Sequence, residues 1–375
     1  MTKNFIITAP IFSYYITRRF FISTFVMLAS LTGLICLFDF IDLLRRITTK
    51  PHVSPLVITQ ITLLHIPFFS MKVLPFSVLL GGIVCFWHFT KTSELIVARA
   101  AGISAWQFLT APVACALLMG ALATMLGSPI SSTLYHRAEN LDRLYLRTNN
   151  TPFYLGNDSF WVRQSDPQNG PAAVAILHAQ KVQLKHSLLT LYDITLFRLN
   201  KDGQLITRID APSGSLAHGH WILNHTETVQ PNSFLHATGR FLLPTNLTLK
   251  RIEESFSSPD TFSIWTLPRF ITMLDQSGFS SIRHRIRFQS LLALPALTGT
   301  MTLIAASFSM RPSRYGGIVP MIGAGVFTGF LLFIIAKISE QFGNSGILPA
   351  VIAAWTPTLT GFCFAVSLLL HLEDG

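Results

Sequence analysis

Six long apolar stretches constrain this sequence more than any other feature. They are Phe20–Phe38, Val73–Phe89, a segment within Ala105–Pro129, Phe288–Met310, Tyr315–Ala336 and Ile347–Leu370. A helix of about 20 apolar residues crosses a hydrocarbon core that is about 30 Å thick. Lipid offers no hydrogen-bond partners to the backbone, so such segments are expected to be helical. The sequence therefore predicts an α-helical integral membrane protein with six transmembrane helices.

Charged residues are gathered in one part of the chain. Residues 131–287 hold 28 of the 46 Asp, Glu, Lys and Arg residues, and the other 218 residues carry 18. This distribution predicts one water-soluble domain inserted between two groups of three helices, and it excludes a soluble enzyme or a disordered chain. The formal net charge of +10 indicates contact with anionic lipid rather than with nucleic acid.

The inserted domain has the alternating pattern of β-strands. Leu188–Leu199 alternates, Asn200–Gly203 is typical of a hairpin turn, and Gln204–Ile209 resumes the pattern. Further turns are expected at Asp166–Pro171, Pro212–Gly214, His218–His220 and Pro231–Ser233, spacings that favour a sandwich or a jelly-roll-like fold. We expect helices one to three in residues 1–134, the β domain in 135–262, and a connector with helices four to six in 263–375, where Ile264–Gln276 is amphipathic.

No motif for catalysis or for a cofactor is present. The sequence lacks the signatures of nucleotide, metal-dependent or serine hydrolases, so another chain must supply the energy for any driven process. All four cysteines lie in apolar runs, which argues against a disulfide framework. Six histidines between His178 and His236 lack partners at metal-ligand spacing, so no metal site is predicted.

The segment between the second and third apolar helices can form a short helix at about residues 92–102. Thr92 or Ser93 can cap its start, Glu94 lies in the first turn, and Gly102 suits the residue after its end. Such a helix is either an ordinary interfacial connector or a docking element for another protein.

Cations follow several of the apolar helices on the side opposite to the N-terminus. Arg45, Arg46 and Lys50 follow helix one, and Arg137 follows helix three. They can anchor the helices at the interface or bind anionic headgroups through arginine–phosphate contacts. Lys72 lies between apolar stretches of helix two, where an ionisable group is either functional or reaches the interface.

Orientation follows from the even number of helices and from the basic residues. An even count places both termini on one side, and a cytoplasmic N-terminus is predicted by the positive-inside rule. It would place seven basic residues in short cytoplasmic segments: Lys3, Arg18, Arg19, Lys91, Arg99, Arg311 and Arg314. The margin is small because the opposite side is also basic.

These features resemble the LptF/LptG family of lipopolysaccharide export permeases over nearly the whole chain. The resemblance rests on Asp42–Arg46, Leu74-Pro75, Leu80–Gly82, Ser93–Leu95, Ala100–Gly102 and the Arg311–Gly317 loop, together with the three-plus-three layout. The aspartate and paired basic residues after helix one are more similar to the LptG branch. Asp39 departs from the pattern, because some relatives carry a basic residue there.

The resemblance implies a non-catalytic transport subunit in the inner membrane, with both termini cytoplasmic and the β domain in the periplasm. Its expected partners are an LptF-like paralogue, an LptB-like ATPase dimer, an LptC-like protein and an LptA-like periplasmic bridge, and its expected substrate is lipopolysaccharide. By analogy, Arg45, Arg46, Lys50 and, more weakly, Arg137 bind lipid A phosphates; adding Lys72 is our own extension. The ATPase would contact Ser93, Glu94, Leu95, Ala98, Arg99 and Gly102.

Two other functions fit the same features. One is a permease of a different lipid or lipoprotein exporter, which a neighbouring gene for an LptF-like paralogue would argue against. The other is a non-transporting scaffold that anchors the β domain, for which charge reversal at Glu94 would have no effect.

Overall fold

The computed structural model describes eleven segments of the chain. They are residues 10–47, 54–146, 160–166, 173–185, 188–200, 203–217, 219–230, 233–245, 258–276, 280–310 and 318–373. These residues form two compact units, a helical unit and a sheet unit, which we describe separately. The helical unit comprises Met1–Asp142, Pro259–Pro268 and Ile282–Gly375, and the sheet unit comprises Arg143–Ser258 and Arg269–Ser281. The domain boundaries at residues 134 and 262 stay predictions.

The helical unit follows the predicted order of helices. Its elements are α1 (Pro10–Ile47), α2 (Pro55–Lys91), α3 (Glu94–Ala100), α4 (Ala105–Leu122), α5 (Ser128–Leu141), the 3-10 turn η4 (Pro259–Thr261), α8 (Ile282–Ser309), α9 (Ile318–Asn344) and α10 (Ala350–Glu373). A π-helical turn, η1 (Ala123–Gly127), joins α4 to α5, and a second, η2 (Asp142–Leu146), follows α5. The amphipathic helix α7 (Leu267–Gln276) begins in the helical unit and continues in the sheet unit.

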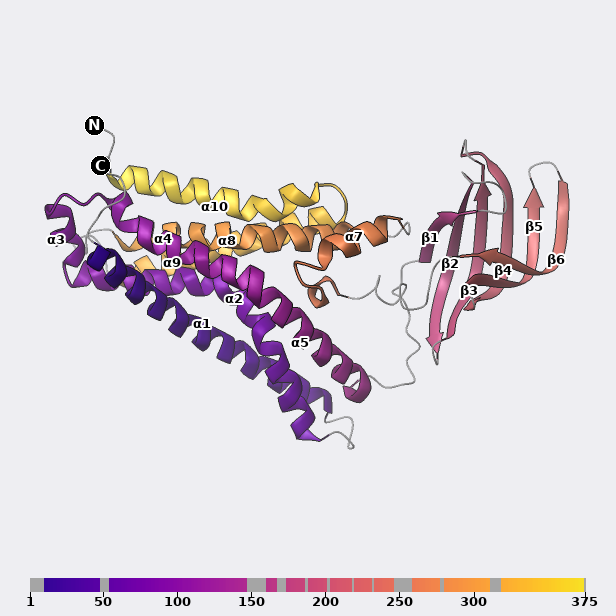
Figure 1. The fold of residues 1–375 in the computed structure, drawn as a ribbon, viewed down its shortest axis with the longest axis horizontal. Helices are drawn as coiled ribbons and strands as arrows, with labels where there is room; N and C mark the ends of the chain where they lie inside the picture. Colours follow the sequence, from indigo (N-terminus) through magenta and orange to yellow (C-terminus); the bar gives the residue numbers. More distant parts are fainter. Residues whose placement is uncertain are drawn as a thin grey trace. The chain divides into compact units, whose positions relative to one another are not determined.

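The prediction of six membrane-spanning helices is confirmed. Within the described segments, six helices are long and apolar enough to cross a membrane: Ile11–Arg46, Pro55–Lys91, Trp106–Leu141, Ile282–Ser309, Ile322–Asn344 and Ala350–His371. Several extend beyond the apolar runs, because polar residues at helix ends continue the same hydrogen-bonded turns. In Figure 1 the beginning of α1, the short helix α3 and the end of α10 lie at one end of the bundle.

Helices α2 and α8 form the centre of the helical unit. In their apolar windows 61% and 72% of the residues are buried, against 17% for α1 and 28% for α9. The outer helices therefore expose the apolar faces that lipid or partner helices can cover.

Hydroxyl groups hold neighbouring helices together inside this bundle. Thr298 Oγ1 on α8 donates to the Ala116 carbonyl on α4, and Thr124 Oγ1 in η1 donates to the Leu291 carbonyl on α8. Thr90 Oγ1 on α2 donates to the Ser309 carbonyl. Hydrogen bonds of this kind contribute modestly to helix association in membranes, about 0.6 kcal/mol on average.

A glycine lets α1 and α2 approach closely. A Cβ atom at Gly81 would lie 2.5 Å from the Thr24 Cα atom, and the Ser23 hydroxyl donates to the Gly81 carbonyl at 2.8 Å. Gly325 and Gly329 on α9 instead make room for side chains of α2, because Cβ atoms there would lie 2.5 Å from the ends of the Ile83 and Leu79 side chains. Small residues thus bring α1 and α2 into backbone contact and let α2 side chains pack against α9.

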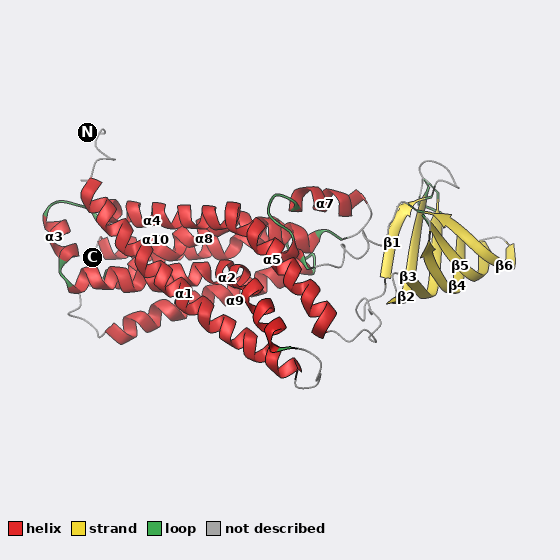
Figure 2. Cartoon of the chain, turned by 60° about the horizontal axis from the view of Figure 1, so that its bottom comes forward, coloured by secondary structure: helices red, strands yellow, loops and turns green. Residues whose placement is uncertain are grey.

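The sheet unit is one antiparallel meander of six strands, drawn side by side in Figure 2. The strands are β1 (Phe160–Ser165), β2 (Val174–Lys185), β3 (Leu188–Leu199), β4 (Leu205–Ala217), β5 (His220–Gln230) and β6 (Ser233–Pro244), in that order. One face forms an apolar core that includes Leu177, Leu196 and Trp221. Strand β3 has the predicted boundaries, and Gly203 has the positive φ of +77° expected in the predicted hairpin turn.

The predicted chain reversal at Pro212–Gly214 is wrong, because these residues lie inside β4. The strand pairing skips one line of positions across the sheet, at Gln180, Asp193, Pro212, His225 and Gly239. Asp193 and His225 have φ values of +52° and +53°, and proline cannot donate to the ladder. Residues typical of turns therefore interrupt the ladder here without reversing the chain.

We expect Gly81→Ala to lower the melting temperature of the detergent-purified protein, because the added methyl group meets the backbone of Thr24. Overpacking of this kind costs about 1–3 kcal/mol. Gly33→Ala on α1 is the matched control, since no atom lies within 4 Å of the position of its Cβ. Equal melting temperatures for the two variants would contradict the close contact between α1 and α2.

Candidate functional site

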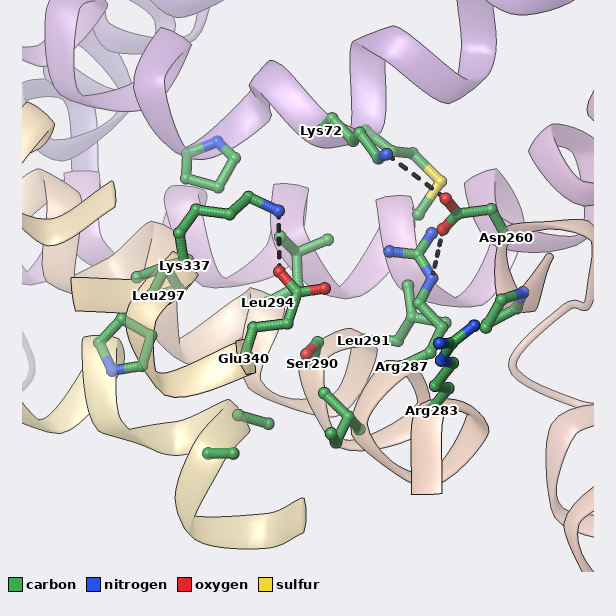
Figure 3. Close-up of a pocket in the computed structure, with 18 of the residues that line it drawn as sticks. Lys72, Asp260, Arg283, Arg287, Ser290, Leu291, Leu294, Leu297, Lys337 and Glu340 are labelled. Carbon is green, nitrogen blue, oxygen red and sulfur yellow. Dashed lines mark hydrogen bonds and ion pairs between the residues drawn. The ribbon is translucent and has the colours of Figure 1, made fainter. Parts of the chain in front are cut away.

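A cavity of about 440 Å³, lined by both apolar and charged side chains, lies within the helical unit. Helices α2, α8, α9 and α10 and the turn η4 contribute its lining, so segments far apart in the sequence meet there. Leu291, Leu294 and Leu297 lie between two groups of charged side chains, Lys337 with Glu340 on one side and Lys72, Asp260, Arg283 and Arg287 on the other, as Figure 3 shows. Its volume is in the range of ligand-binding pockets.

Three charged residues meet in this cavity, one each from α2, η4 and α8. Lys72 Nζ lies 3.4 Å from Asp260 Oδ2, and Arg287 Nε lies 3.2 Å from Asp260 Oδ1 (Figure 3). The side chains of Asp260 and Arg287 are each 22% exposed, and Lys72 also lies over the Phe68 ring. A carboxylate between two cations compensates charges that would be costly to leave unpaired in this setting.

A second ion pair lines the same cavity from α9. Lys337 Nζ lies 2.8 Å from Glu340 Oε2, one turn along the same helix. Arg283 on α8 also lines the cavity. The lining therefore has four cationic side chains, Lys72, Arg283, Arg287 and Lys337, against two carboxylates, so a site with a net positive charge faces the cavity.

Helix α3 presents two different faces. Leu95 and Ala98 are buried, and Leu95 belongs to the core of the helical unit. On the outside, Ile96 and Val97 are 63% and 67% exposed. A seven-residue helix therefore displays an apolar surface that its own unit leaves uncovered.

The ends of α3 are fixed by local hydrogen bonds. Thr92, one of the two expected caps, instead places its hydroxyl 2.9 Å from both Glu94 Oε1 and the His88 carbonyl oxygen, which compete for its single hydrogen. Gly102 has a φ of +84° and suits the predicted position after the helix, where Ile103 N donates to the Ala98 carbonyl. The helix is anchored at both ends, with Glu94 half-buried beside its exposed face.

The other predicted lipid-binding cations lie outside the cavity lining. Arg45, Arg46 and Arg137 are exposed, and Arg46 forms a 2.7 Å ion pair with Asp42 one turn earlier. Lys50 lies outside the described residues, as does the Arg311–Gly317 loop. Of the four predicted substrate-binding residues that the structure describes, only Lys72 lines the cavity.

Asp39, where the sequence departs from the family pattern, has a hydrogen-bond partner on α2. Asp39 Oδ2 lies 2.9 Å from His65 Nδ1, and the two side chains are 19% and 15% exposed. The His65 ring packs at 5.4 Å from the Tyr135 ring. Asp39 thus links α1 to α2 next to α5.

Comparison with known proteins extends these observations. The family model for the lipopolysaccharide export system permease LptF/LptG matches residues 14–371. The chain belongs to the LptF/LptG family. It is 23% identical over 359 residues to the LptG permease protein of Escherichia coli strain K12, covering 93% of this chain and 94% of the relative. It is also 23% identical over 353 residues to the LptG protein of Haemophilus influenzae, covering 92% and 94%.

Family membership confirms the resemblance found in the sequence, including its LptG-like character. A member of the LptF/LptG family is a lipopolysaccharide export permease, a non-catalytic transporter component, and a multi-pass protein of the inner membrane. Among the described residues, no group of three or more His, Cys, Asp or Glu side chains could hold a metal ion.

Sequence reasoning missed several cavity residues. Asp260 lies in a segment with no repeating pattern, so nothing in the sequence pairs it with Lys72. Lys337 and Glu340 follow the predicted end of helix five. Oppositely charged residues three positions apart are typical of a helix, and this pair could have indicated that helix five continues through residue 340. Arg283 and Arg287 precede the apolar run of helix four, and no sequence pattern assigns them to a cavity.

Proposed function

We propose that this chain is the permease subunit of an ATP-driven exporter that extracts lipopolysaccharide from the inner membrane and passes it to a periplasmic bridge. The observation that best supports this proposal is the exposed face of helix α3. It presents exposed Ile96 and Val97 beside the carboxylate of Glu94, while Leu95 ties the helix to the bundle core. An apolar face that is firmly attached to the bundle suits the transmission of a movement from a partner.

The partner that fits this face is a separate ATPase. The chain itself has no nucleotide-binding motif, so ATP hydrolysis must take place in another protein. We propose a dimer of LptB-like ATPases that binds the segment comprising Ser93, Glu94, Leu95, Ala98, Arg99 and Gly102. Leu95 and Ala98 face the bundle in the isolated chain, so their part is to position the helix.

The proposed orientation places α3 in the cytoplasm. The beginning of α1 and the end of α10 lie at the same end of the bundle as α3 (Figure 1), which supports cytoplasmic termini and a periplasmic sheet unit. Arg18 and Arg19 near this end agree with the positive-inside rule.

We further propose that the cations bind the phosphate groups of lipopolysaccharide. Arg45 and Arg46 are exposed near the end of α1 that lies away from α3, and Lys72 lines the cavity of the helical unit. Arg137, exposed on α5, and Lys50 are proposed for the same role. Arginine and phosphate form charge-assisted, often bidentate contacts, which suit capture of a phosphorylated lipid.

An LptF-like paralogue, an LptC-like protein and an LptA-like bridge complete the proposed assembly. Purification of the chain in mild detergent, followed by mass spectrometry of proteins and lipids, tests it. We expect a paralogue, an ATPase and bound lipopolysaccharide. Recovery with a different ATPase and a lipoprotein would favour another exporter, and recovery of the chain alone would favour a scaffold.

We expect Glu94→Lys to reduce the amount of co-purifying ATPase by about tenfold, because reversing a charge at an interface typically costs more than 1 kcal/mol. Quantitative mass spectrometry of the purified complex measures the ratio. Glu227→Lys is the matched control, an identical change at an exposed position on β5. An equal ATPase ratio in the two variants, with the melting temperature unchanged, would refute α3 as the docking helix.

Replacing Arg45 and Arg46 together by Gln should lower lipopolysaccharide retention at least fivefold, since a hydrogen bond to a charged group contributes about 1.5–3 kcal/mol. Assembly with the ATPase should be unaffected, because both side chains are exposed. The control replaces Arg18 and Arg19, an exposed pair near the other end of α1. Retention that is equal in both double variants would assign Arg45 and Arg46 an anchoring role only.

A further inference from the structure

Asp260 occupies an unusual position between two cations from different helices. Its carboxylate reaches Lys72 on α2 with one oxygen and Arg287 on α8 with the other. Pro259 and Asp260 belong to the short turn η4, so this acidic group comes from the connection between β6 and α8. The chain thus places an anion of its own in a cavity with more cations than carboxylates.

The contacts of Asp260 are long for ion pairs. They measure 3.4 Å to Lys72 and 3.2 Å to Arg287, whereas charge-assisted contacts are typically about 2.7–2.9 Å. In the same cavity Lys337 and Glu340 approach to 2.8 Å. One carboxylate therefore spans the gap between the cations without a short contact to either.

The Nε–H group of Arg287 is a hydrogen-bond donor that can still accommodate an acceptor. Its Nε atom is buried and lies near Asp260 Oδ1, yet their orientation makes no hydrogen bond, and the described residues provide no other partner for Nε. A guanidinium presents donors in a fixed fork that fits two oxygens of one anion. A larger anion with three oxygens can satisfy the fork and still reach Lys72.

We propose that Lys72 and Arg287 form a binding site for a lipid phosphate, and that Asp260 is an internal counter-anion which this phosphate displaces. The proposal rests on the proposed function and deepens it, because it names two residues that function together with Lys72. Arg283, which also lines the cavity and is exposed, adds positive charge beside the site.

Displacement of Asp260 has a structural consequence. Asp260 ties η4 to α2 and α8 through its two ion pairs. When a phosphate takes over both cations, these two ion pairs are lost, while the residues after the turn keep their contacts with α5, such as Ile264 N with Ser128 Oγ. Occupation of the cavity is thereby linked to the connection that leads from the sheet unit into α8.

Binding of defined lipids to the full chain, purified with its partners in detergent, tests the proposal. The probes are bisphosphorylated lipid A, its dephosphorylated form and phosphatidylglycerol, and the readout is the dissociation constant. We expect Asp260→Asn to tighten binding of a phosphate-bearing probe about threefold to tenfold, because a competing anion is removed. Lys72→Gln combined with Arg287→Gln should weaken binding by at least as much.

A matched control and a combined variant make the test specific. Glu340→Gln removes a carboxylate from the same cavity, but its partner Lys337 lies on its own helix, so binding should change less than twofold. In the Lys72→Gln, Arg287→Gln background, adding Asp260→Asn should have no further effect. Tightening that persists in this background, or an equal effect of Glu340→Gln, would contradict displacement.

The three probes separate the sources of the phosphate and the two proposals. Tightening for lipid A alone identifies the export substrate, and tightening that includes phosphatidylglycerol identifies a bilayer lipid headgroup. If lipid A binds the unaltered protein but Asp260→Asn leaves every dissociation constant unchanged or raises it, the counter-anion role is refuted and the export function stands. If only phosphatidylglycerol responds and no lipopolysaccharide co-purifies, the anion site stands and the export function fails.

Discussion

The absence of hydrogen-bond partners in lipid is the constraint on which the helical unit depends. It requires every backbone amide and carbonyl in the bilayer to find a partner within the protein, so the spanning segments are long helices. The same constraint directs hydroxyl groups to carbonyls on neighbouring helices, as for Thr298 with Ala116 and Thr124 with Leu291. Packing of this bundle therefore combines close contacts at small residues with a few directed hydrogen bonds.

Charge inside the bundle follows the same reasoning. Lys72 and Arg287 would be costly as isolated cations, and a carboxylate from the η4 turn compensates them. Asp39 and His65 form a second polar contact between helices, joining α1 to α2 at 2.9 Å. Buried ionisable groups restrict how the helices can pack, because each group needs a partner of opposite charge or a hydrogen bond. In our proposal, a phosphate ligand replaces Asp260 as the partner of Lys72 and Arg287.

Patterns that depend on neighbouring residues could be predicted from the sequence. The six spans, strand β3 and the short helix before Gly102 follow from periodicity, length and local hydrogen bonding. Contacts between distant residues could not, because Asp260 is 188 positions from Lys72 and no local signal joins them. The turn predicted at Pro212 fails for a related reason, since a turn-forming residue can interrupt the pairing of a strand without reversing the chain.

We propose that this chain lets a partner ATPase drive lipopolysaccharide out of the inner membrane. Transfer of lipopolysaccharide from proteoliposomes that contain the purified assembly to an added LptA-like acceptor, measured over time, tests this proposal. We expect transfer that requires ATP hydrolysis and that stops when this chain is omitted. Transfer that continues without the chain, or an assembly that hydrolyses ATP yet releases lipoprotein and no lipopolysaccharide, would contradict it.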